Sequence, residues 1–171
     1  SADDTDRRMR LAIINDDMPF LVDSIAAAIA AHDIAIERIL HPIVPVTRGA
    51  DGALTQIGDG TRESRIYIEM ERADARTRRA LASEIEAALA NVRSAVSDWE
   101  ALQLAMAADA AWLRDSGRDL DGEGAALLDW FLDRNFTLLG HEKWRRTGKS
   151  TERLGIARHN QSVPLLAEAS R

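Results

Sequence analysis

Three hydrogen-bond acceptors, Asn15, Asp16 and Asp17, stand together just before Pro19. The residues before them are apolar on both faces, as in a central strand, and those after them carry an apolar stripe of helical period. Amide and carboxylate oxygens at such a crossover can accept the N–H groups that the first helical turn leaves unpaired. Negative charge there also suits the helix dipole, and Pro19 fits the first helical position. The residues alone therefore predict a strand–turn–helix unit with a helix-capping turn.

Other reactive patterns are absent from the sequence. The four histidines lack the spacing of metal ligands, and the lack of cysteine excludes thiolate ligands, disulfides and a cysteine nucleophile. Gly148-Lys149-Ser150-Thr151 resembles the end of a phosphate-binding loop, but Lys143 occupies the position of the required first glycine. Neither Gly-x-Gly-x-x-Gly nor Gly-x-Ser-x-Gly occurs. We therefore expect no catalytic residue, no metal site and no cofactor site in this segment.

The composition narrows the class of partner and compartment. A net charge of −6 argues against nucleic acid and anionic membranes as partners. No apolar run approaches the roughly 20 residues of a membrane span, and no leader peptide opens the chain. The lack of cysteine fits a reducing compartment, so we expect a cytoplasmic protein. A length of 171 residues suits one domain, or one domain with a short extension.

Alternating and helical patterns predict the elements that position the turn. Pro42 and Pro45 make the second strand an edge or irregular strand, and a slip in its alternation near Arg38 indicates a bulge. The glycine-rich residues 49–61 suggest a long mobile hairpin loop. We expect strands near 8–15, 35–47, 64–72 and 136–146 in one antiparallel sheet, with helices 19–32 and 75–96 on a single face.

Three motifs carry a resemblance to a known family. A strand, an Asp-x-Pro turn and an apolar helix resemble the start of an ACT domain. More specifically, residues 16–24 (DDMPFLVDS), His41-Pro42-Ile43-Val44 and the run from Trp130 to Gly140 are similar, in this order, to the N-terminal region of the large bacterial NAD-specific glutamate dehydrogenases. The resemblance covers most of residues 9–146. It implies that this segment is a non-catalytic regulatory or assembly part of a longer enzyme. The NAD site and the catalytic lysine of that enzyme are then expected beyond residue 171.

The resemblance also points to a ligand site and to partners. ACT modules often hold ligands near this turn, so Asn15, Asp16, Asp17, Met18 and Phe20 are candidates for binding an amino-acid effector through its ammonium group. The alternative is that the turn only caps the helix. ACT patterns usually have glycine directly after the proline, and Phe20 at that position would crowd a ligand. The expected partners are the rest of the parent chain and further copies in a homo-oligomer.

A long helical pattern over 74–115 suggests an interface. At 1.5 Å per residue it would span about 60 Å, twice what a small sheet can cover, so the helix either protrudes or breaks. Ser97-Asp98-Trp99-Glu100 has the capping-box spacing that a break would use. The apolar stripe after that point either folds back on the helix predicted at 123–134 or meets another chain. Its members, the candidate interface residues, are Trp99, Leu102, Met106 and Leu113.

Together these expectations define an α+β protein with a ferredoxin-like βαββαβ (ACT-like) antiparallel sheet and an enlarged helical insertion before the last strand. The rival functions are a free-standing amino-acid sensor and a purely structural dimerisation domain. The expected divisions are 1–7, disordered or an expression remnant; 8–96, the ACT-like core; 97–135, a helical extension; 136–146, the last strand of the sheet; and 147–171, a hairpin and loose tail cut from a longer chain.

Overall fold

The computed structural model describes residues 8–144 and 150–159. The chain forms two compact units, residues 1–90 and 91–171, and helix α2 begins in the first and ends in the second. In chain order, the first unit contains β1 (Met9–Asp16), α1 (Leu21–Ala30), β2 (Ile36–Leu40), β3 (Ile43–Arg48), β4 (Leu54–Ile57), β5 (Thr61–Met70) and the start of α2 (Ala75–Ser97).

Strand β5 is the centre of an antiparallel sheet. Strand β1 pairs with one of its edges, in a register that runs from Met9 opposite Met70 to Asp16 opposite Glu63. Strands β2 and β3 both pair with the other edge, and β4 pairs with β3. The register shifts between Ile36 and Arg38, which confirms the expected bulge. The first three predicted strands are therefore confirmed as one antiparallel sheet.

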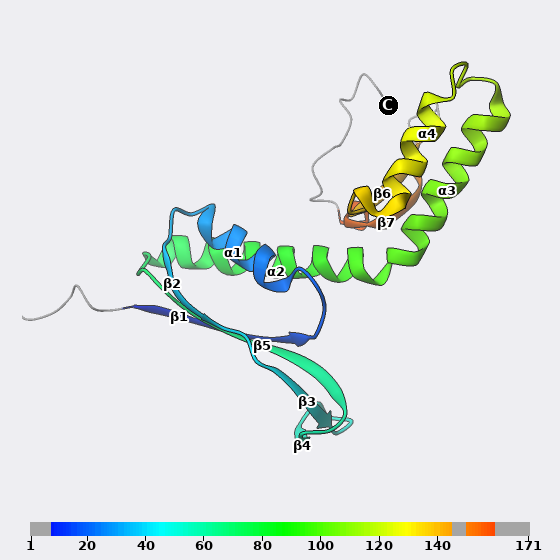
Figure 1. Ribbon diagram of the computed structural model, residues 1–171. Helices are drawn as coiled ribbons and strands as arrows, with labels where there is room; N and C mark the ends of the chain where they lie inside the picture. The colour runs from blue at the N-terminus through cyan, green and yellow to red at the C-terminus, as the bar shows by residue number, and fades with distance from the viewer. Residues whose placement is uncertain (1–7, 145–149, 160–171) are drawn as a thin grey trace, which may run out of the picture. The chain divides into compact units, whose positions relative to one another are not determined.

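The core of this unit lies on one face of the sheet. Every second residue of β5 from Ser64 to Met70 is buried, and α1 and α2 lie on the same side of the sheet in Figure 1. His32, just after α1, contacts Glu84 on α2, with 3.0 Å between Nε2 and Oε2. The large buried aliphatic side chains are Leu21, Ile25, Ile29, Ile34, Val46, Ile66, Ile68, Met70, Leu81 and Ile85.

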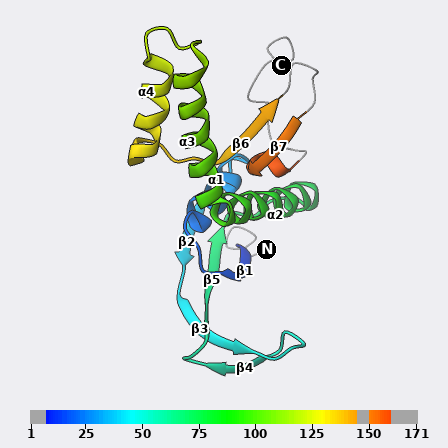
Figure 2. The same ribbon diagram turned by 90° about the vertical axis from the view of Figure 1, so that its right-hand side faces the viewer.

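The predicted loop over 49–61 is wrong in its middle, where the chain forms strand β4. Strands β3 and β4 extend as an arm from the helix-covered part of the sheet (Figure 2). Thr55 Oγ1 donates a hydrogen bond to the carbonyl of Thr47 across the arm, at 2.9 Å. Arg48 Nη1 donates to the carbonyl of Gly52 in the turn, at 2.7 Å. These bonds compensate for the strand-weakening glycines that favoured a loop.

The second unit consists of two helices and a small hairpin. Strand β6 pairs with β7 in a separate two-stranded sheet, so the prediction that residues 136–146 complete the first sheet is wrong. A partner close in the sequence costs less loop-closure entropy than a distant sheet. The elements are α3 (Trp99–Ser116), α4 (Glu123–Trp130), a π-helical turn (Phe131–Asn135), β6 (Gly140–Trp144), β7 (Ser150–Gly155) and a 3-10 turn (Ile156–Arg158).

These findings confirm an α+β fold with an antiparallel sheet and correct its topology. In the described residues the first unit follows the ferredoxin-like order only as far as its second helix, without the fourth core strand. Strand β4 belongs to the arm. Residues 1–7 and 160–171, for which loose ends were predicted, and the turn predicted at 147–149 lie outside the described residues.

The long helical pattern breaks, which decides between the two alternatives, but the cause of the break differs from the expected capping box. Asp98 separates α2 from α3, and its side chain does not cap α3. Its carboxylate instead accepts a hydrogen bond from the backbone N–H of Gly155, at 2.7 Å, and pairs with the guanidinium of Arg158. The break is therefore supported by contacts with the end of β7 and the 3-10 turn. Across the described ranges, no helix is long and apolar enough to cross a membrane.

Candidate functional site

The acidic turn between β1 and α1 is bonded to β5. The carboxylate of Asp17 accepts hydrogen bonds from Arg62 Nε at 3.1 Å and from Ser64 Oγ at 2.9 Å, and the backbone N–H of Asp17 donates to the carbonyl of Arg62 at 3.0 Å. Ser64 is fully buried, so this bond satisfies a hydroxyl that would otherwise be costly to bury. Asp17 therefore joins the turn to the sheet, and its acceptor capacity for an incoming ammonium group is reduced.

Phe20 is the residue at which the turn enters α1. The helix begins at Leu21, two residues after Pro19, so the expected placement of proline at the first helical position is wrong. Phe20 has φ 69° and ψ 1°, the left-handed conformation that glycine adopts without strain. Its side chain is 48% exposed. The backbone thus keeps the glycine-like geometry of the ACT pattern, and the ring lies half in solvent.

The remaining predicted ligand residues lie beside Asp17. Asn15 is half-buried, and its Nδ2 donates to the carbonyl of Asp16 at 2.9 Å. Asp16 is exposed, and Met18 is half-buried. The structure therefore brings Asn15, Asp16, Asp17, Met18 and Phe20 together at one end of the sheet, and amino-acid binding there stays a prediction.

Sequence reasoning missed the partners on β5. Arg62 and Ser64 lie 45 and 47 residues from Asp17. The partner of Ser64 could have been anticipated, because a serine at an inward-facing position of a strand needs a hydrogen-bond partner. No sequence pattern indicated the role of Arg62.

A second polar contact supports the arm. Glu63 is buried, and Arg48 donates to both of its carboxylate oxygens, Nε to Oε1 at 2.5 Å and Nη2 to Oε2 at 3.0 Å. The hydrogen bond from Arg48 is the main cause that lowers the pKa of Glu63, and Arg65 also contributes. The bidentate pair satisfies a carboxylate that burial would otherwise disfavour.

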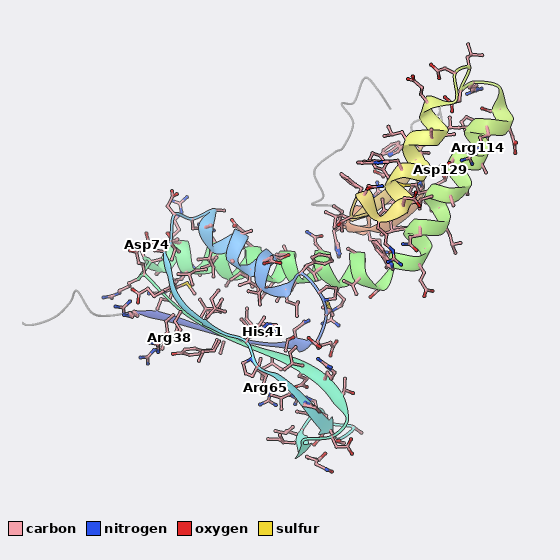
Figure 3. All side chains as sticks on the ribbon, in the orientation of Figure 1. Arg38, His41, Arg65, Asp74, Arg114 and Asp129 are labelled. Atoms are coloured by element: carbon pink, nitrogen blue, oxygen red, sulfur yellow. The ribbon has the colours of Figure 1, made fainter. Side chains whose placement is uncertain are left out.

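The face of the sheet away from α1 and α2 is uncovered in the first unit. Glu69 lies between Arg10 and Arg38, with N···O distances of 3.5 and 3.6 Å, and Tyr67 Oη donates to it at 2.8 Å. Figure 3 shows Arg38 on this side of the sheet. The Tyr67 hydrogen bond, followed by the two arginines, lowers the pKa of Glu69.

Two large apolar side chains are exposed on the same face as this charged cluster. Ile14 is 59% exposed and Leu40 52% exposed. In the described residues, β1 pairs only with β5, so its other edge has no strand partner. The sheet therefore offers two exposed apolar side chains and a strand edge.

The candidate interface stripe on α3 packs largely within its own unit. Leu102 is 1% exposed, which makes it a core residue, and Met106 and Leu113 are half-buried. Trp99 remains 40% exposed. Arg114 on α3 pairs with Asp129 on α4 (Figure 3), so α3 folds back on α4. Of the four residues, Trp99 retains the most interface character.

Comparison with known proteins agrees with this architecture. Residues 3–85 match the family model described as glutamate dehydrogenase, ACT1 domain. Residues 3–85 belong to this ACT1 domain family. The match ends within α2, close to the boundary of the first unit at residue 90. The predicted resemblance is thereby confirmed.

The similarity extends beyond the ACT1 domain. An NAD-specific glutamate dehydrogenase from Pseudomonas aeruginosa is 31% identical over 144 residues, which is 77% of this chain and 9% of the relative. One from Halomonas elongata is 28% identical over 169 residues, which is 88% of this chain and 10% of the relative. The chain thus spans about a tenth of the length of these relatives.

Neither the ACT1 domain nor the second unit gathers metal ligands within residues 8–144 and 150–159. No group of three or more histidine, aspartate or glutamate side chains there is placed to hold an ion. The polar clusters of the ACT1 domain are instead pairs of opposite charge that satisfy each other, such as Glu63 with Arg48. Such pairs join elements of the fold. They are not arranged as the nucleophile, base and orienting group of a catalytic site.

Proposed function

We propose that this chain is a non-catalytic assembly and regulatory segment of an NAD-dependent glutamate dehydrogenase. The complete enzyme would convert L-glutamate, NAD and water to 2-oxoglutarate, ammonia and NADH. NAD would bind outside these residues, because the sequence has no dinucleotide-binding fingerprint. The catalytic lysine would lie outside them as well. A cytoplasmic location is part of the proposal.

The ACT1 match over residues 3–85 carries the proposal. The length of the relatives favours a segment of a larger enzyme over a free-standing amino-acid sensor. The contacts of Asp17 favour assembly over sensing, since its carboxylate is already bonded to Arg62 and Ser64. An amino-acid effector at this turn would have to compete with those bonds.

The uncovered sheet face of the ACT1 domain is the surface we propose for assembly. Ile14 and Leu40 expose apolar area, and the adjacent edge of β1 offers backbone groups to a further strand. The partners would be the rest of the parent chain, a second copy or both. A purely structural dimerisation module would use the same face without any effect on catalysis.

The test compares single lysine variants of the complete dehydrogenase. Ile14→Lys and Leu40→Lys place a charge on the uncovered face, and Leu120→Lys, at a position 94% exposed, is the control. We expect at least about tenfold weaker association for the face variants by sedimentation velocity, because burying an unpaired ammonium group is costly. Thermal unfolding should be unchanged.

Glutamate-dependent NADH formation then separates the two assembly roles. A change in rate that accompanies dissociation supports regulation through assembly, and an unchanged rate supports a structural module. If both face variants assemble like the control, the proposed surface is wrong.

A further inference from the structure

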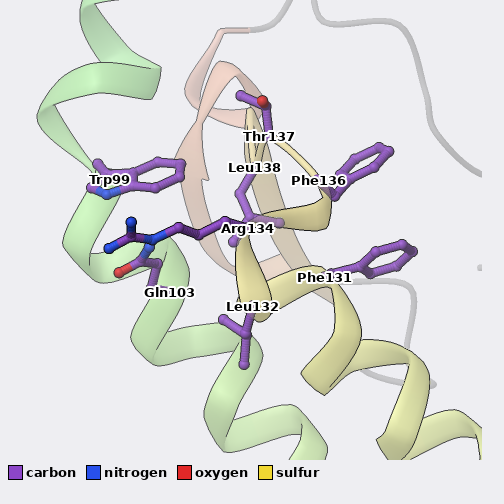
Figure 4. Close-up of a pocket in the computed structure, with 8 residues that line it drawn as sticks. All are labelled: Trp99, Gln103, Phe131, Leu132, Arg134, Phe136, Thr137 and Leu138. Carbon is purple, nitrogen blue, oxygen red and sulfur yellow. The ribbon is translucent and has the colours of Figure 1, made fainter.

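A cavity of about 400 Å³ lies in the second unit, between the start of α3 and the segment that follows α4. This size is within the roughly 300–1,000 Å³ range of small-molecule sites. Its lining combines aromatic rings with a cation, an amide and a hydroxyl (Figure 4), and no acidic side chain is part of it. The residues that matter here are Trp99, Gln103, Phe131, Arg134, Phe136 and Thr137.

Arg134 is the charged group of this cavity. Its guanidinium extends toward Trp99 and Gln103 in Figure 4. Within the described part of the chain, no carboxylate pairs with it. An arginine that faces a cavity without an anionic partner can donate two parallel N–H bonds to a carboxylate.

The backbone at Arg134 is strained. Arg134 lies at a kink within Phe131–Asn135 and has the left-handed conformation, with φ 63° and ψ 19°. Glycine or asparagine holds this conformation at lower cost. Residues with a strained backbone concentrate at functional sites. Because the exposed side chain of Arg134 also faces the cavity, Arg134 is a candidate for ligand binding.

The aromatic lining defines the rest of the ligand. The rings of Phe131 and Phe136 are 4.9 Å apart between centroids, and Trp99 lies on the other side of Arg134 in Figure 4. Such rings pack against a flat or branched apolar group. Gln103 and Thr137 can orient it by hydrogen bonds. The lining has no carboxylate to pair with an α-ammonium group, which disfavours a free amino acid.

We propose that this cavity binds a small organic carboxylate with an aromatic or branched apolar body and no ammonium group. Arg134 holds the carboxylate, and the body packs against Trp99, toward which the guanidinium extends. The site is distinct from the acidic turn of the ACT1 domain, and it does not depend on the proposed role in assembly.

The first test measures charge and ring recognition by calorimetry on the 171-residue chain. The probe is 3-phenylpropionate, compared with the neutral 3-phenylpropanamide, with L-phenylalanine and with acetate. We expect each comparison compound to bind at least about tenfold more weakly. The amide loses the charge-assisted bond, acetate loses the ring contact, and L-phenylalanine brings an ammonium group that finds no partner. Equal affinity for the carboxylate and the amide, or no binding of 3-phenylpropionate at millimolar concentration, would refute the proposal.

The second test separates ligand binding from a structural role of Arg134, whose charge could also favour the end of α4. In Arg134→Gly we expect at least about tenfold weaker binding, without a lower melting temperature, because glycine relieves the left-handed strain. Arg118→Gly, which removes an equal charge outside the cavity, should bind like the unmodified chain.

Arg134→Lys keeps the same kind of backbone and a charge but loses the paired donors, so it should bind with intermediate affinity even if the glycine variant does not fold. NMR locates the ligand. The indole N–H signal of Trp99, assigned with Trp99→Phe, should shift on addition of 3-phenylpropionate, and that of Trp112 should not. Unchanged affinity in both Arg134 variants, equal weakening in Arg118→Gly, or a static Trp99 signal would contradict the assignment.

Discussion

The ACT1 unit buries large aliphatic side chains between a sheet and two helices, whereas many buried apolar side chains of the second unit are small. In the second unit these include Ala95, Ala110, Ala125 and Ala157. Apolar area removed from water is the main stabilising term in folding, at roughly 25 cal/mol per Å². The second unit, with smaller side chains inside, must depend more on other contacts.

Those contacts are polar and join the hairpin and 3-10 turn to the helices. Asp98 accepts from Gly155 and pairs with Arg158. The carboxylate of Asp109 contacts His141 Nε2 at 2.7 Å and Lys143 Nζ at 3.1 Å. The comparison shows that one chain can combine a unit stabilised mainly by the burial of large apolar side chains with a unit that depends more on ion pairs, hydrogen bonds and backbone geometry.

Loss of core volume should give the largest effect. Ile25 is 0% exposed on α1, and Ile25→Ala should cost about 3–4 kcal/mol of unfolding free energy in the ACT1 unit, since the cavity it leaves can collapse only in part. Hydrogen exchange should show lost protection in β1 and β5. Ile14→Ala on the uncovered face is the control, and equal losses for both variants would contradict the assigned core.

Backbone geometry should dominate in the second unit. Gly155 has φ 59°, and a Cβ there would lie 2.1 Å from the carbonyl oxygen of Leu139. Gly155→Ala should therefore cost about 2 kcal/mol or more, measured by urea unfolding followed through hairpin NMR signals. In the β3–β4 turn, a Cβ at Gly52 would meet nothing within 4 Å. Gly52→Ala should therefore lower the unfolding free energy only by the strain of positive φ, about 1 kcal/mol. Equal costs would mean that the close contact is absent.

A smaller, pH-dependent effect is expected at Asp98. The hydrogen bond from Arg158 is the main cause that lowers its pKa below the ordinary 3.8. The ionised carboxylate therefore stabilises the folded state above about pH 4, and this contribution is lost as the pH falls through the lowered pKa.

Asp98→Asn should cost about 1 kcal/mol at pH 7 and progressively less in acid. Thermal melts of the second unit between pH 7 and pH 2.5 check this, with the exposed Asp115→Asn as control. A cost that stays constant with pH would show that the charge of Asp98 is not involved.

The smallest effect is expected at Phe20. Burial of its ring would have made Phe20→Ala cost about 3–5 kcal/mol, but the side chain is 48% exposed. In Phe20→Gly, relief of the left-handed strain offsets part of the lost packing, so we expect a net change within about 1 kcal/mol. Phe20→Val should be clearly worse by chemical denaturation, because a β-branched residue tolerates positive φ poorly. If the glycine and valine variants unfold alike, strain at this residue is not significant.

Much of the ACT1 unit could be predicted because its elements carry their own periods. The alternation around Ile66, Ile68 and Met70 indicated a strand with one covered face, and the structure agrees. The acidic turn was placed correctly but its role was not, because Asp17 bonds to β5 and not to the first turn of the helix. A capping pattern is local, and it cannot reveal competition from a strand 45 residues away.

The second unit was harder to predict for the same reason. The break at Asp98 was visible in the sequence, but its tether to Gly155 and Arg158 was not. The cavity at Arg134 left no local pattern, because its lining comes from two separate segments. A left-handed arginine is also invisible in a sequence, where glycine is the usual signal.

The sequence by itself determined the resemblance to an ACT-like region, the type of most elements and the apolar face of β5, because motifs and side-chain periods are local properties of the chain. Only the tertiary structure decided that β6 pairs with β7, that Asp17 bonds to β5 and that Leu102 is internal. An apolar period states which face must be covered, but the covering partner depends on the competing free energies of all segments that can reach it.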